Sequence, residues 1–216
     1  MKSLFSDLKT SILLTVILLV LICGVYPMAV WAGAQALFGD KANGSLVMDA
    51  SGAVRGSRLL AQNFASDKYF QPRPSAAGTG YDATSSGGTN FGPTSDKLAN
   101  GSHAKDAKGK DVNDPGNFDG IKDLVAAYRT SNGLAADAPV PADAVTRSAS
   151  GLDPHISPAN AMVQAARVAK ARNLPLATVQ GLIDANTDGR SLGILGEAGV
   201  NVLTLNMALD RQAPAK

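Results

Sequence analysis

The chain has 216 residues, of which 18% are charged and 5% are aromatic, and its formal net charge at pH 7 is +2. This length suits one ordinary domain with an appendage, and the nearly balanced charge gives no indication of a nucleic-acid partner. The single cysteine, Cys23, excludes an internal disulfide framework and a cysteine-rich metal centre. His103 and His155 lack the spacing of a zinc motif, so we expect no metal site.

The N-terminal part of the chain is apolar enough to enter a bilayer. Residues 10–39 contain no charged side chain, and about 20 helical residues suffice to span a membrane. Pro27 lies within this segment, where a membrane helix tolerates it with a kink. A cleaved signal peptide is the alternative, because residues 32–34 read Ala-Gly-Ala. The apolar stretch is longer than the roughly 7–15 residues of such a peptide, which favours a permanent transmembrane helix.

The charges that flank this span predict its orientation. Lys2 and Lys9 precede it, against the single acid Asp7, which favours a cytoplasmic N-terminus. We therefore expect residues 1–9 in the cytoplasm, residues 10–39 in the bacterial inner membrane and residues 40–216 as a periplasmic domain. The lipid bilayer is thus the first expected partner.

Short elements are predicted in the first half of the domain. Residues 46–48 suit a strand between two turn signals, and Ser57 suits the cap of a helix that ends near Phe64. A helical turn is expected within residues 94–99. Residues 100–117 are small and polar and are interpreted as a solvated loop insertion, in which His103 is a surface residue. Residues 118–133 follow a helical period that Gly133 can end.

The second half is mainly helical. Residues 134–150 are predicted to be extended, with a strand interrupted by prolines. Ser157 and Pro158 provide the cap and first position of a helix that reaches residue 173. Two further helices are expected at 174–187 and 200–210. The expected fold class is α+β: a single N-terminal transmembrane helix followed by one mainly helical extracytoplasmic domain with short strands.

Residues 69–93 have a loop-like composition yet contain four of the eleven aromatic residues. A disordered linker is poor in aromatic side chains, because it has nothing to bury them against. Prolines on both sides of Arg73 fix the backbone there, and five glycines, at 78, 80, 87, 88 and 92, are expected to allow turns that other residues resist. We therefore expect the aromatic rings to pin an irregular but ordered loop onto the helices, as a shaped surface for recognition.

Motifs for catalysis are scarce. The phosphate-binding GxxxxGK[ST], complete GxGxxG and GxSxG patterns do not occur. Residues 85–88 could form an anion-binding nest or a tight turn, and the turn is the favoured interpretation. Asp153 and His155 precede the Ser157 cap, where they could satisfy a helix N-terminus or act as a catalytic pair. We expect no catalytic residue.

Four segments in order resemble one known family. They are "GSRLLAQNFASDKYFQPRPSA" at 56–76, "YDATSSGGTNFGPTSDKL" at 81–98, "VTRSASGLDPHISPANAMVQAARVAKARNL" at 145–174 and "LGEAGVNVLTLNMALD" at 195–210. With the single N-terminal span, they are similar to the C subunit, KdpC, of the bacterial potassium-importing Kdp ATPase. The likeness covers nearly the whole chain. It departs at Glu197-Ala198-Gly199, where the family often has Glu-Pro-Arg, so a charge contact at residue 199 is in doubt.

The resemblance implies a subunit that is not an enzyme by itself. Members assemble with a channel-like potassium-selecting subunit, a P-type ATPase subunit and a small single-span subunit. The family is described as a catalytic chaperone that raises the ATP affinity of the hydrolysing subunit. ATP is therefore implied mainly on that partner, and potassium is the transported ion. The chain itself lacks the Asp-Lys-Thr-Gly-Thr phosphorylation motif.

An outer domain cannot touch cytoplasmic nucleotide, so its effect on ATP affinity would pass through the membrane subunits. We expect docking on the potassium-selecting subunit through two loops, 69–93 and 150–157. The candidate partner-binding residues are Tyr69, Phe70, Arg73, Tyr81, Asp82, Ser86, Gly87, Asn90, Gly92, Asp153 and His155. The alternatives are direct ATP binding with the opposite topology, a membrane-anchored periplasmic hydrolase that uses Asp153 and His155, and a stand-alone binding module.

Overall fold

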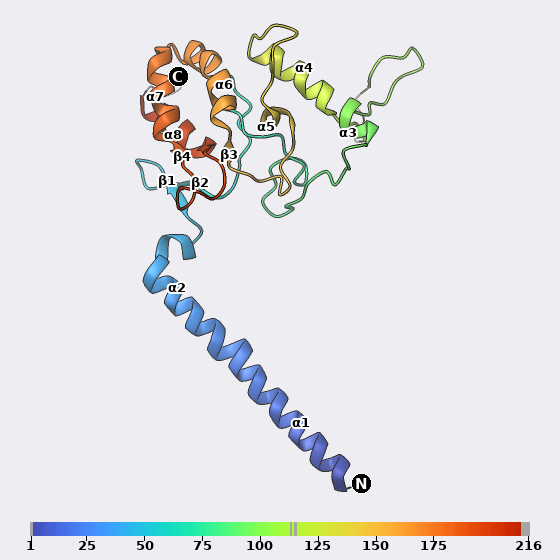
Figure 1. Cartoon of the computed structure of the whole chain (residues 1–216), viewed down its shortest axis with the longest axis vertical. Coiled ribbons are helices and arrows are strands. Elements are labelled where there is room, and N and C mark those ends of the chain that lie inside the picture. The colour runs from blue at the N-terminus through green and yellow to red at the C-terminus, as the bar shows by residue number, and fades with distance from the viewer. Residues whose placement is uncertain (1, 113, 115, 213–216) are drawn as a thin grey trace. The chain divides into compact units, whose positions relative to one another are not determined.

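The structure is a computed structural model that describes residues 2–112, 114 and 116–212. It divides into two compact units, Met1–Leu46 and Val47–Lys216. The first unit is helical, and the second combines helices with short strands (Figure 1). The mixed helix-and-strand class with one N-terminal apolar helix is thereby confirmed.

The first unit is one long helix with a wide turn in it. It comprises α1 (Lys2–Val20), a π-helical turn (Leu21–Val25) and α2 (Tyr26–Ala42). Ser3–Ala42 is long and apolar enough to cross a membrane, by length and composition. The wide turn directly precedes Pro27, whose ring clashes with the carbonyl four residues back and displaces the normal α-helical turn. A second irregularity occurs at Phe38, whose φ and ψ are −140° and 39°.

The main core of the second unit lies among three helices: α6 (Pro158–Arg172), α7 (Leu176–Ala185) and α8 (Val202–Gln212). They lie together in the domain (Figure 1). Ser157 caps α6 by accepting a hydrogen bond from the Asn160 backbone N–H, and Pro158 occupies the first turn, as predicted. The fully buried residues that fill this core are Phe70, Ile156, Ala161, Ala165, Val168, Val179, Ile183, Val200, Leu205 and Leu209.

Two small sheets complete the frame. β3 (His155–Ile156), β5 (Gly199–Asn201) and β4 (Thr187–Asp188) form an antiparallel sheet in the order β3-β5-β4. Its centre is Val200, which is opposite Ile156 on one side and Thr187 on the other. β1 (Leu46–Met48), predicted from the sequence, pairs with β2 (Val54–Ser57).

A second, smaller core joins α4 (Ile121–Ser131) and α5 (Ala142–Val145) to α6 through Val163. Tyr128 of α4 donates a hydrogen bond to Asn160 Oδ1 at 2.8 Å. Asp143 of α5 accepts hydrogen bonds from the backbone N–H and hydroxyl of Ser157, at 2.7 and 2.8 Å. Polar contacts therefore connect this core to the start of α6. The predicted helical turn is α3 (Asp96–Asn100), which Ser95 caps.

Two expectations are wrong in detail. No helix follows Ser57, because the Ser57 hydroxyl accepts a bond from the Leu59 N–H in a turn and the Ala61 N–H donates to Leu152 O. Within 134–150, where an extended strand was expected, α5 forms one helical turn. The described residues of 100–117 are mostly exposed, and bridges between residues 102 and 118 and between 105 and 111 fold this loop back on itself.

Candidate functional site

The loop 69–93 is ordered although it contains no helix or strand. Phe70 is completely buried among the main-core side chains Ile156, Leu205 and Leu209. Tyr69 packs 5.5 Å from the Phe64 ring, and the Arg172 guanidinium lies 4.7 Å from the centre of the Tyr69 ring. The expectation that aromatic rings fix this loop to the helices is confirmed for these two residues.

Side-chain amides replace a neighbouring strand along the start of the loop. Asn206 of α8 accepts a hydrogen bond from the Phe70 N–H and donates one to the Phe70 carbonyl, both at 2.9 Å. Gln164 of α6 does the same for Gln71, at 2.8 and 3.1 Å. Backbone groups that are buried need such partners. Two amides on different helices therefore hold consecutive residues of an irregular chain.

Arg73 ties the proline-rich part of the loop to residues 146–153. Its guanidinium donates to Thr146 O at 3.3 Å and to Asp153 Oδ2 at 3.0 Å. The Tyr81 hydroxyl donates to the Arg73 carbonyl at 2.9 Å. Burial raises the pKa of Tyr81 to about 12, so the phenol keeps the proton that it donates. Arg73 and Tyr81 thus hold the loop in its shape.

The loop and the turn 148–151 form one continuous unit. Ser75 Oγ donates to Gly151 O at 2.6 Å and accepts from the Tyr81 N–H, while the Gly87 N–H donates to Ser150 O at 2.9 Å. Gly151 has φ of +68°, and a Cβ there would lie 2.6 Å from Gly87 O. Only glycine allows both this conformation and this close approach.

The remaining loop candidates lie farther out. Asp82 Oδ1 accepts bonds from the Thr84 hydroxyl and N–H, and the Thr84 hydroxyl is the main reason that the pKa of Asp82 is lowered. Asn90 is exposed and has φ of +56°. Residues 85–88 do not form the favoured tight turn, and the Gly87 N–H already donates to Ser150 O instead of facing an anion. The predicted conformational role is wrong for Gly87, Gly88 and Gly92, because none of them has positive φ; a Cβ on Gly88 would nevertheless lie 2.9 Å from Ala149 O, whereas one on Gly92 would meet nothing.

Asp153 and His155 belong to a chain of alternating charges. His155 Nε2 lies 3.0 Å from Asp188 Oδ2, and its Nδ1 lies 3.8 Å from Asp153 Oδ1. Asp188 pairs with Arg58 at 2.6 Å, and Asp153 with Arg73 at 3.0 Å. Because both ring nitrogens face carboxylates, the imidazole offers no free nitrogen to activate a nucleophile. This geometry suits a structural connection between β3, β4 and the loop.

The same contacts shift the pKa values in this chain. Attraction to Asp153 first, and to Asp188 as well, raises the pKa of His155 above its ordinary value. Burial acts to raise the pKa of Asp153, but hydrogen bonds from His155 and Arg73 outweigh it, and this pKa is lowered. An aspartate–imidazolium arrangement is therefore favoured in the folded protein.

We expect the stability of the protein to depend on pH through His155. A raised folded-state pKa means that protonated His155 stabilises the fold fully below the unfolded value of about 6.5, and that this contribution is lost as pH rises through the folded-state pKa. The free energy of unfolding, measured by urea denaturation of the detergent-solubilised chain, should fall more across this window than in His155→Gln. Equal pH slopes for the two proteins would contradict it.

The residues whose side chains hold the loop and the His155 chain in place were not predicted from the sequence. Gln164 and Asn206 are buried on the inner faces of α6 and α8, and a polar amide within an apolar helical stripe was the available signal for both. Arg58 and Asp188, which complete the chain around His155, had no local signal, because they are 130 residues apart in the sequence.

Apart from Phe91, which is 38% exposed, the exposed side of the joined loops consists mainly of small residues. Those exposed in the described structure include Ala83, Thr84, Ser85, Ser86, Ala149 and Ser150. These small side chains can fit closely against a partner and form hydrogen bonds with it. Fold and site together define a class: an α+β domain with an ordered loop surface, preceded in the chain by an apolar helix long enough to cross a membrane.

Comparison with known proteins specifies the family. The family model "KdpC: K+-transporting ATPase, c chain" matches residues 8–211. The chain is similar to proteins named "Potassium-transporting ATPase KdpC subunit" from three organisms. The Mycobacterium tuberculosis protein is 50% identical over 187 residues, which cover 87% of this chain and 88% of the relative. The protein from Caulobacter sp. strain K31 is 48% identical over 210 residues, with coverages of 97% and 96%, and that from Myxococcus xanthus is 47% identical over 208 residues, with 96% and 89%.

The chain therefore belongs to the KdpC family, as the sequence resemblance indicated. It is an accessory subunit of a potassium-transporting ATPase complex and is not catalytic by itself. At the position where the family departure occurs, Glu197 pairs with Arg190 at 2.7 Å, and a Cβ on Gly199 would lie 3.1 Å from the Cβ of His155. A glycine at residue 199 thus leaves room for His155.

Proposed function

We propose that this chain is the non-catalytic accessory subunit of a high-affinity, ATP-driven potassium import complex. Its partners are a channel-like potassium-selecting subunit, a P-type ATPase subunit and a small single-span subunit. The chain assists assembly and raises the ATP affinity of the hydrolysing subunit. Family membership and the apolar N-terminal helix support this role.

One observation carries the docking part of the proposal: the loop 69–93 and the turn 148–151 are cross-connected by side chains into one ordered surface. Ser75 donates to the Gly151 carbonyl, while the Ser86 hydroxyl and the Gly87 N–H both donate to the Ser150 carbonyl. Loops that are already ordered lose little conformational entropy on binding, which favours affinity. Phe70 is buried, Tyr69, Arg73 and Tyr81 are partly buried and hold the loop in shape, and the exposed residues, Phe91 among them, are the ones that meet a partner.

The orientation determines how such docking acts. Lys2 and Lys9 favour a cytoplasmic N-terminus, so the domain lies outside and docks near the outer mouth of the potassium-selecting subunit. The membrane helix confines the domain beside its partners and raises its effective concentration there. The effect on cytoplasmic ATP is then a coupling free energy between distant sites, typically about 1–3 kcal/mol.

A single cysteine can test both sidedness and docking. In a Cys23→Ala background, Ala83→Cys places a thiol on the exposed loop, and Ala177→Cys places the control thiol on the exposed face of α7. We expect a membrane-impermeant maleimide to label both in intact cells that make this subunit alone. When the other subunits are present, labelling of the Ala83→Cys protein should fall several-fold, while the control remains unchanged.

Two results would contradict the proposal. Labelling of either cysteine only after cell lysis would place the domain in the cytoplasm. Equal labelling of the loop cysteine with and without the other subunits, in cells where the complex assembles, would remove this loop from the interface.

A further inference from the structure

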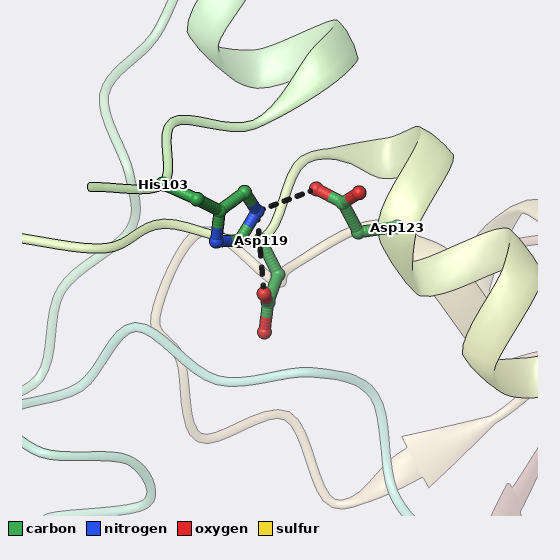
Figure 2. Close-up of side chains that lie close together, drawn as sticks. All are labelled: His103, Asp119 and Asp123. Carbon is green, nitrogen blue, oxygen red and sulfur yellow. Dashed lines mark hydrogen bonds and ion pairs between the residues drawn. The ribbon is translucent and has the colours of Figure 1, made fainter. Parts of the chain in front are cut away.

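His103, Asp119 and Asp123 converge outside the loop site described above (Figure 2). His103 Nε2 lies 3.1 Å from Asp123 Oδ2 and 3.8 Å from Asp119 Oδ1. The three ligand atoms all lie within 4.8 Å of one another. His103 comes from the polar insertion, Asp123 from the first turn of α4, and Asp119 from the segment between them. These residues are up to twenty positions apart in the sequence, so no local sequence motif indicates that they lie together.

The backbone fixes this convergence. The N–H of Ser102 and the N–H of Phe118 each donate to the other residue's carbonyl at 2.8 Å, which brings the neighbouring His103 and Asp119 together. Asp123 Oδ2 accepts the Gly120 N–H at 2.9 Å, which orients its carboxylate at the start of α4. The cluster is therefore held by its surroundings rather than by chance contacts of long side chains.

We propose that His103, Asp119 and Asp123 bind a divalent transition-metal cation, with Zn²⁺ as the best match. One neutral imidazole and two carboxylates balance the charge of such an ion, and water can complete its coordination. Two ligands about 2.1 Å from one ion lie roughly 3.4 Å apart at a tetrahedral angle. The distances of 3.1 and 3.8 Å from His103 bracket this value, and the Asp119 side chain, 62% exposed, is able to rotate inward.

The charges around the cluster distinguish it from the one at His155. There, each carboxylate pairs with an arginine. Among the described residues, neither Asp119 nor Asp123 forms an ion pair with lysine or arginine. The ion-pair partner of both carboxylates is His103. This second histidine–aspartate cluster therefore places two carboxylates beside one imidazole, without a directly paired arginine or lysine among the described residues.

Other charged groups lie near without occupying the site. Arg147 stacks 4.3 Å from the centre of the Phe118 ring and donates to the backbone carbonyl of Asp119, and Lys97 lies 5.6 Å from the same ring. Lys122 acts on Asp123, Arg147 acts on Asp119 and Asp111 acts on His103 through longer-range electrostatic interactions. The direct contacts of Arg147 and Lys97 are with the Phe118 ring and a backbone carbonyl, so an ion has to displace only the contact between His103 and Asp123.

Isothermal titration of the metal-stripped full chain with ZnCl₂ tests the proposal. The protein should be purified in detergent with a tag that contains no histidine. We expect one Zn²⁺ per chain, with an affinity reduced at least tenfold in His103→Ala and in Asp119→Asn. Asp119→Asn alters an exposed side chain and leaves the Asp123 cap of α4 in place. His155→Ala is the matched control and should bind Zn²⁺ as the wild type does.

A second measurement reports on the position of the ion. Zn²⁺ should slow tryptic cleavage in the insertion at residues 105–110 of the wild-type chain but not of His103→Ala, because the ion joins the insertion to α4. Equal Zn²⁺ affinity for the wild type and both site variants would overturn the proposal, as would a loss of binding that occurs only in His155→Ala.

Discussion

Replacing Phe70 with alanine is expected to lower the free energy of unfolding by about 3–5 kcal/mol. The Phe70 ring is completely buried between the loop and the helices of the main core, so its removal leaves a cavity that the surrounding helices can fill only in part. The loop 69–93 should also lose its attachment at this end, because Phe70 is its one fully buried aromatic residue among the described ones.

Urea denaturation of the detergent-solubilised chain, followed by far-UV circular dichroism, measures this loss. Phe91→Ala is the matched control. Phe91 belongs to the same loop but is 38% exposed; it contacts Phe118 edge-to-face and its ring centre lies 5.9 Å from Lys97 Nζ, so its removal should cost about 1 kcal/mol or less. Equal losses for the two variants would show that burial of Phe70 does not anchor the loop.

The second large effect is expected from Asn206→Leu. This change keeps the side-chain volume but leaves the buried N–H and C=O of Phe70 without their partner. Each buried backbone group left unsatisfied costs about 1–3 kcal/mol, so the free energy of unfolding should fall by several kcal/mol in the same assay. Amide exchange at Phe70 and Gln71 should accelerate, since their attachment to the helices is weakened.

Gln180→Leu is the control for this change. Gln180 is exposed on α7, and the same substitution there should alter stability by about 0.5 kcal/mol or less. If Asn206→Leu were as stable as the wild type, the two hydrogen bonds to Phe70 would not be needed to hold the loop, and the amide pairing described here would be incidental.

The elements with strong local signals could be predicted from the sequence. Ser157 and Pro158 located the start of α6, and the spacing of Val202, Leu205 and Leu209 gave the buried face of α8. The helix predicted after Ser57 is absent, because a backbone N–H of this region bonds a partner remote in sequence, as Ala61 does with Leu152. No local pattern reports such pairing.

The order of the loop 69–93 could be predicted from the sequence, but the roles of its residues could not. Tyr69, Arg73 and Tyr81 were proposed as partner contacts because they belong to a loop with scarce aromatic rings and a proline-fixed arginine, yet each is at least partly buried and bonded within the domain. The residues that remain exposed, such as Ala83 and Ser86, are small and chemically plain. Composition predicts an ordered loop. Only the path of the backbone shows which of its residues are buried against the domain and which are exposed.

The wide turn at Leu21–Val25 has a consequence for assembly of the membrane helix. Pro27 has no N–H, so at least one carbonyl in the preceding turn has no donor within the helix. In the hydrocarbon interior, a carbonyl without a donor costs several kcal/mol, and neighbouring helices or trapped water must supply one. The side of the helix that carries this turn should therefore face protein rather than lipid in the assembled transporter, and it marks where a companion helix with a polar side chain belongs.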